Sequence, residues 1–150
     1  MDSFSLPALK VKAEDRDDLH IIAAHMQDAL LPLHSLYFNQ EEGTFSALCN
    51  RFCWEHDGHF FKGEPLYHRV HSGLCFRHVR AVHHKGFHRS VERHPLNLLS
   101  LQAEEKPGYV NVHLLFSGQS EIRLQAEAIK CHLGDLHYPW PTRHKPNHDL

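Results

Sequence analysis

The sequence lacks the features that mark membrane-spanning and secreted proteins. No run approaches the roughly 20 consecutive apolar residues that cross a bilayer, and the first ten residues have neither a basic nor an apolar leader region. The four cysteines contain no C-x-x-C pair, so they predict neither a zinc ribbon nor a zinc finger. We therefore expect four reduced thiols in a cytoplasmic protein that makes no membrane contact.

Motifs of the common enzyme classes are lacking too. The chain contains no G-x-S-x-G, G-x-G-x-x-G or G-x-x-x-x-G-K-[ST] pattern, which removes the usual support for a hydrolase, a Rossmann fold or a P-loop. Glu55, His56 and Asp57 bring two acids and an imidazole together, but neighbouring residues of a strand point to opposite faces. The sequence therefore favours a non-enzymatic protein and leaves the question open.

A strong charge of either sign is also absent, whereas histidine is abundant. The formal net charge is −2 with neutral imidazoles, and 17 of the 150 residues are histidine. Half-protonation of these side chains near pH ~6.5 would make the net charge positive. A hydrophobic content of 41% over this length predicts one domain, residues 1–150, with a core that needs no disulfide or metal.

One helix is predicted near the N-terminus. Asp15 has the properties of an N-cap, and apolar residues then recur at helical spacing until Pro32, which predicts a helix over about 16–30. Residues after about 143 are expected to fray, and the prolines after Gly134 argue against a further strand.

The remaining pattern is that of antiparallel strands. A hairpin is expected at 33–38 and 44–54, with later strands near 66–70, 73–83, 99–103, 110–116 and 122–133. The apolar phase slips at Val79 and Ile129, which we interpret as bulges. The predicted fold class is α+β, with the helix at about 16–30 packed on a curved antiparallel sheet or partly open barrel of six to seven strands.

Three segments carry a family resemblance: HMQDA at 25–29, LCNRFCWE at 48–55 and SGLCFRHV at 72–79. Together they resemble an uncharacterised family of small bacterial proteins, a domain of unknown function whose members have about this length. The resemblance covers most of the chain and departs at His68, His71 and His83, where similar sequences are rich in arginine. It implies a single cytoplasmic domain and assigns no activity.

The central segment is the first candidate site. Asn50, Arg51, Trp54 and Glu55 place a planar guanidinium, a large aromatic ring and a carboxylate on one strand, and Arg77 adds a second arginine. Tryptophan and arginine are frequent anchors of protein interfaces, so these five residues are predicted to bind a partner. The alternative is a central strand in which Trp54 fills the core and Arg51 pairs with an internal acid.

The second candidate site is a basic, histidine-rich block. Residues 68–94 hold six Lys or Arg, one acid and seven histidines. His83, His84 and His88 could ligate zinc or another divalent transition metal, or the block could bind anions, including nucleic-acid phosphates. The isoelectric point of about 6.8 and the lack of an RRM, KH or helix-turn-helix signature argue against nucleic acid.

Taken together, the sequence predicts a small cytoplasmic interaction domain. It would engage a protein partner or a second copy of itself, without a cofactor. Metal or anion binding through the histidine-rich block at 68–94 is the alternative function.

Overall fold

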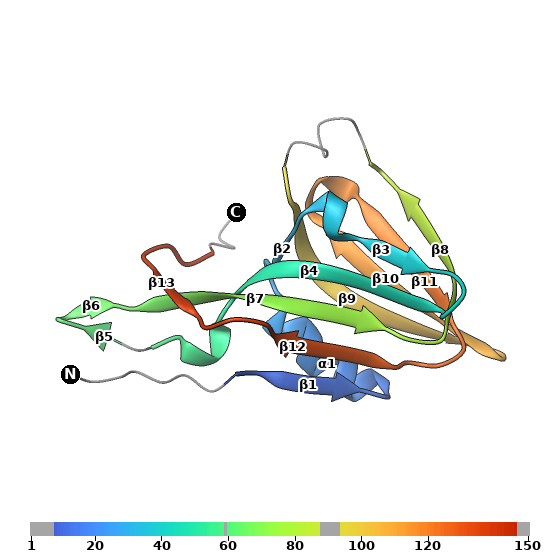
Figure 1. Cartoon of the computed structure of the whole chain (residues 1–150), viewed down its shortest axis with the longest axis horizontal. Coiled ribbons are helices and arrows are strands. Elements are labelled where there is room, and N and C mark those ends of the chain that lie inside the picture. Colours follow the sequence, from blue (N-terminus) through green and yellow to red (C-terminus); the bar gives the residue numbers. More distant parts are fainter. Residues whose placement is uncertain (1–7, 59, 88–93, 147–150) are drawn as a thin grey trace.

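The computed structural model describes residues 8–58, 60–87 and 94–146 (Figure 1). One α-helix and thirteen strands alternate with short 3-10 turns. In chain order the elements are β1 (Lys10–Ala13), α1 (Arg16–His25), β2 (Leu30–Leu31), η1 (Leu33–Ser35), β3 (Tyr37–Asn39), β4 (Thr44–Phe52), η2 (Trp54–His56), β5 (Phe60–Phe61), β6 (Glu64–Pro65), β7 (Tyr67–Phe76), β8 (Val79–Lys85), β9 (Leu96–Lys106), β10 (Tyr109–Phe116), η4 (Ser117–Gln119), β11 (Glu121–Ala126), β12 (Cys131–Asp135) and β13 (Trp140–Thr142).

Eleven of the strands form one antiparallel sheet. Its order is β1-β12-β7-β4-β2-β9-β10-β11-β8, with β3 paired to β4 and β13 paired to β7. The end strands β1 and β8 do not pair with each other, so the sheet is not closed. The remaining two strands, β5 and β6, form a separate hairpin that projects beyond the body beside β13 (Figure 1).

The sheet folds over on itself through the two-residue strand β2. Leu30 pairs with Asn50 of β4 on one side and with Asn97 of β9 on the other. In Figure 1 the strands β1, β12, β7 and β4 form the near layer, and β9 and β10 lie behind them. One apolar cluster draws buried side chains from both layers and from α1, so the core lies between the layers.

The predicted fold class is therefore wrong. A sheet of eleven strands replaces the expected six or seven, and strand rather than a mixture of helix and strand dominates the chain. The strands that the sequence failed to predict are the short ones, above all β1, β2 and β13, which have only two to four residues. Alternation of apolar and polar residues cannot be recognised over so few positions.

The helix is shorter than the predicted range of 16–30. Asp15 does cap it, because the Asp15 carboxylate accepts the backbone N–H of Asp18 at 2.8 Å. The helix ends at His25, and Asp28 adopts a left-handed conformation with φ +61°. The N–H of Asp28 then donates to the carbonyl of Leu98 in β9, so the chain leaves the helix to pair with the sheet.

Both predicted bulges lie at strand boundaries, and the register of β8 against β11 is also irregular at Val79, because Gln125 pairs with Ala81 and Ala126 pairs with Val79. β7 ends at Phe76, and His78 turns the chain with φ +58° before β8 begins at Val79. In the same way, β11 ends at Ala126 and β12 begins at Cys131. A slip of phase marks a new strand here because each strand keeps its own apolar face towards the core.

The C-terminal segment also differs from the expectation. Pro141 lies in β13, which pairs with β7 at the edge of the sheet, where a residue without an N–H group is tolerated. Lys145 forms an ion pair with Asp57 at 2.6 Å. Of the tail predicted to fray, residues 147–150 lie outside the described residues.

None of the helices in the described ranges has the length and apolar character needed to cross a membrane.

Candidate functional site

Arg51 of β4 lies inside the fold. Its side chain is 0% exposed, and its guanidinium donates to both oxygens of Glu55 at 3.0 and 2.8 Å. It also donates to both oxygens of Asp135 in β12 at 3.1 and 3.0 Å. Ser72 of β7 donates its hydroxyl to Asp135 at 2.7 Å. The arginine is therefore the cation of an internal ionic cluster. Of the two alternatives predicted from the sequence, this is the one in which Arg51 pairs with an internal acid.

Charge in this cluster is balanced unevenly. Two carboxylates share one guanidinium, and His25 at the end of α1 brings its Nδ1 to 3.8 Å from Glu55. Burial alone would raise the pKa of Glu55, but the neighbouring His25 and Arg51 outweigh it and hold that pKa well below its usual range. Burial likewise opposes the charge of Arg51, yet the two acids raise its pKa. Both groups are charged in the folded protein.

The other predicted partner-binding residues are placed as follows. Trp54 donates its indole N–H to the carbonyl of Gln27 at 2.9 Å and packs edge-on against Phe52. The side-chain oxygen of Asn50 accepts from Arg69 at 3.1 Å. Arg77 follows the far end of β7 and is exposed. The structure thus brings Asn50, Arg51, Trp54 and Glu55 into one region and leaves Arg77 outside it.

The three segments that carry the family resemblance meet at this cluster. His25 contacts Glu55, Gln27 binds Trp54, and the Met26 sulfur lies 3.6 Å from the Cys49 sulfur. Burial raises the pKa of the Cys49 thiol to about 12, so the thiol stays protonated. Each of these contacts joins two residues of this chain, so we interpret the cluster as structural.

Glu55 gives the cluster a testable dependence on pH. Because the folded state lowers the pKa of Glu55 below its ordinary ~4.3, the ionised carboxylate stabilises the fold above that pH. The contribution is lost as the pH falls towards the folded-state pKa. We expect the free energy of unfolding to fall less between pH 6 and pH 3 in Glu55→Gln than in the wild type, as measured by urea unfolding.

Glu105 provides the matched control for that experiment. It is an exposed glutamate of β9 without an ion pair to any described residue. Glu105→Gln should keep the wild-type dependence on pH. Equal slopes in all three proteins would contradict the role assigned to Glu55.

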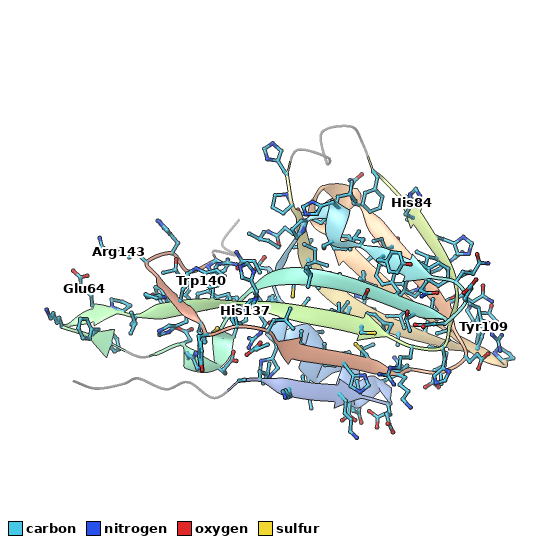
Figure 2. The ribbon with its side chains drawn as sticks, in the orientation of Figure 1. Glu64, His84, Tyr109, His137, Trp140 and Arg143 are labelled. Carbon is cyan, nitrogen blue, oxygen red and sulfur yellow. The ribbon has the colours of Figure 1, made fainter. Side chains whose placement is uncertain are left out.

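A second site lies on the outer face of the other layer. His83, His84 and Lys85 of β8, His113 of β10, and Glu121 and Arg123 of β11 line a concave pocket of about 240 Å³. The register explains part of the grouping, because Arg123 lies directly between His83 on one neighbouring strand and His113 on the other, whereas His84 is opposite the buried Ile122. Side chains opposite each other in adjacent strands share one face of a sheet. Figure 2 shows His84 on β8, far from Trp140 and Arg143 at the opposite end of the molecule.

The one carboxylate of this pocket is already engaged. Glu121 accepts from His113 Nδ1 at 2.6 Å and pairs with Lys85 at 3.1 Å. The bond with His113 lowers the pKa of Glu121, Lys85 adds to the effect, and partial burial opposes it. The guanidinium of Arg123, in contrast, has no ion pair or hydrogen bond to any of the residues that the structure describes. Its guanidinium is available to a ligand.

The predicted metal ligands are only partly brought together. His83 and His84 both line the pocket, whereas His88 lies outside the described residues. Among residues 8–58, 60–87 and 94–146 there is no group of three or more His, Cys, Asp or Glu side chains that could hold a metal ion. Zinc binding by this block stays a prediction.

Sequence reasoning missed three residues of this pocket. His113, Glu121 and Arg123 occupy the polar positions of two strands whose apolar positions were recognised correctly. Their outward direction therefore followed from the alternation. The sequence could not show that β8 lies beside β11, because some 40 residues of chain separate these two strands.

Comparison with known proteins gives one match. A family model described as "Protein of unknown function (DUF2948)" matches residues 9–148. No curated protein and no solved structure matches the chain.

Proposed function

The chain belongs to the DUF2948 family of proteins of unknown function, and we propose that it binds a small anion with a tetrahedral oxyanion group, such as sulfate or phosphate. The binding site is the pocket on β8, β10 and β11. The observation that supports this most is the guanidinium of Arg123, which is unpartnered among the described residues and lies between His83 and His113.

The electrostatics of the pocket favour an anion. Lys85 and Arg123 are two permanent cations, and the single carboxylate, Glu121, is held by Lys85 and His113. A guanidinium offers two parallel N–H groups that match the oxygens of such an anion. His83 and His84 add imidazoles, whose ring N–H groups can donate hydrogen bonds to an anion.

The partner-binding hypothesis has less support than the anion pocket. The partner-binding surface at Asn50, Arg51, Trp54, Glu55 and Arg77 stays a prediction, but Arg51 and Glu55 satisfy each other inside the fold. A cytoplasmic location belongs to the proposal and is supported by four free thiols, which are usual in a reducing compartment.

Arg123→Gln is the variant that tests the proposal. Sulfate is titrated into the protein at constant ionic strength, and heat release is measured by calorimetry. Loss of a charge-assisted pair worth ~1.5–3 kcal/mol should weaken binding about 10- to 150-fold. Arg143→Gln, an exposed arginine at the opposite end of the molecule, is the matched control and should bind like the wild type (Figure 2). Absence of sulfate binding in the wild type would refute the proposal.

A further inference from the structure

The outer face of the near layer differs in character from the pocket. Alternation turns Ala47, Cys49 and Leu74 into the core, so the residues between them face outward. The register then aligns outward residues in rows across the strands. One row runs Tyr37, Ser46, Cys75, His132, Lys12 across β3, β4, β7, β12 and β1.

The outward positions of these fully described strands include lysines but no acids. Lys10 and Lys12 are exposed at the β1 edge of this face, and neither forms an ion pair with a residue in the described part of the chain. None of the outward positions of β1, β12, β7, β4 and β3, all fully described, is Asp or Glu. The one acid of these strands, Asp135, turns inward to Arg51. A polyanion could therefore lie across these strands without meeting a carboxylate.

Aromatic rings are exposed on the same face. Tyr37 is 62% exposed at the β3 edge. His71 of β7 is exposed, and its ring centroid lies 4.7 Å from that of Trp140 in β13. Figure 2 shows Trp140 and His137 beside β7. Flat rings on a surface of this kind stack on nucleobases, with a contribution of ~1–3 kcal/mol per base.

Two glycines lie between the rings and the lysines. Gly73 and Gly134 are directly opposite each other in β7 and β12, and a Cβ added at Gly134 would meet nothing within 4 Å. The side chain of Leu136 lies over Gly73, and both Leu136 and the neighbouring Leu48 are about half exposed. The centre of the face is therefore apolar, and planar groups can approach the backbone closely at Gly134.

From these observations we propose that this lysine–aromatic face, defined by Lys10, Lys12, Tyr37, His71, His132 and Trp140, binds single-stranded nucleic acid. Tyr37 and the His71–Trp140 pair stack on bases, and Lys10 and Lys12 contact phosphates. The charge complementarity selects a polyanion, and the exposed rings select one with unpaired bases. The inference goes beyond the anion pocket, which lies in the other layer of the sheet.

Fluorescence anisotropy with a labelled 12-nucleotide poly-U RNA tests the inference. At 50 mM salt the full-length protein should bind it more tightly than the same length of duplex RNA. Affinity should fall with salt, because each phosphate contact contributes about −0.7 to the log–log slope for single strands. Lys10→Gln with Lys12→Gln should therefore make the slope less steep by about 1.4.

Tyr37→Ala separates stacking from charge. Loss of one stacked base should weaken binding about 5- to 150-fold and leave the salt slope unchanged. Lys106→Gln with Arg80→Gln removes the same charge from the other half of the sheet and should leave the slope at its wild-type value. These residues are exposed, so circular dichroism should show all variants folded.

Two results would overturn the inference. One is no binding of the RNA at 50 mM salt. The other is equal binding of a labelled 12-residue poly-glutamate peptide with no effect of Tyr37→Ala, which would identify the face as a site for an acidic protein segment. Sulfate binding to the pocket is measured separately, so either result leaves the proposed function untouched.

Discussion

Replacing Arg51 with alanine is expected to lower the free energy of unfolding by about 3–5 kcal/mol. The guanidinium is 0% exposed, and its removal leaves the Asp135 carboxylate, itself 3% exposed, without its cation. An unpaired buried charge costs far more than a lost surface ion pair, which is worth ~0–1 kcal/mol. Urea unfolding at pH 7 measures the loss.

A double-mutant cycle shows whether the pair is the cause. Asp135→Ala should also destabilise the protein, because Asp135 additionally accepts the N–H of Leu9 and the hydroxyl of Ser72. With Arg51 and Asp135 both replaced, no unpaired charge remains between them, so the double variant should lose clearly less than the sum of the single losses. Additive losses, or a loss below 1 kcal/mol for Arg51→Ala, would contradict the assignment.

Gly86→Ala is expected to destabilise the protein by about 2–4 kcal/mol, the second largest effect. Gly86 follows β8 with φ +79°, a conformation that costs a residue with a side chain ~1–2 kcal/mol. A Cβ there would also lie 2.3 Å from the backbone oxygen of Gln119, so the backbone must shift, which typically costs ~1–3 kcal/mol. The loop is held in place by the Ser120 hydroxyl, which donates to the carbonyl of Gly86 at 2.9 Å.

Gly108 is the matched control for Gly86. It has nearly the same backbone angle, φ +82°, but a Cβ there would meet nothing within 4 Å. Gly108→Ala should therefore show only the conformational cost of ~1–2 kcal/mol. Thermal unfolding of both variants compares the two, and equal losses would mean that the contact with Gln119 is relieved without cost.

How far the sequence predicts the site is clearest at Arg51. The sequence predicted either that Arg51 binds a partner or that it pairs with an internal acid, and it named Glu55 only as a member of the partner-binding set. Asp135 was not named, because it is 84 residues away and reaches Arg51 only through the pairing of β12 with β7 and of β7 with β4. Local pattern gives the direction of a side chain, and the order of strands decides its partner.

The same distinction between local pattern and long-range contacts explains which parts of the fold were predicted. The hairpin between Asn39 and Thr44 and the turn after Lys106 were predicted, because each has its turn residues between two alternating segments. The end of the helix was not predicted. It is set by the N–H of Asp28, which donates to the carbonyl of Leu98, about 70 residues later. Contacts between distant segments override local propensity at that point.

The pairing of β1 with β12 constrains the order in which the strands of the sheet can pair. Lys10 to Ala13 find their partners only at Cys131 to Gly134, and the N–H of Leu9 bonds the carboxylate of Asp135. While the chain is being synthesised, β1 therefore lacks its partner strand until residues 131–134 have been made. Contacts this distant in sequence are costly to close and slow to form. Asp135, one of the two acids that pair with Arg51, lies in β12 as well, so Arg51 lacks this partner until β12 has been made.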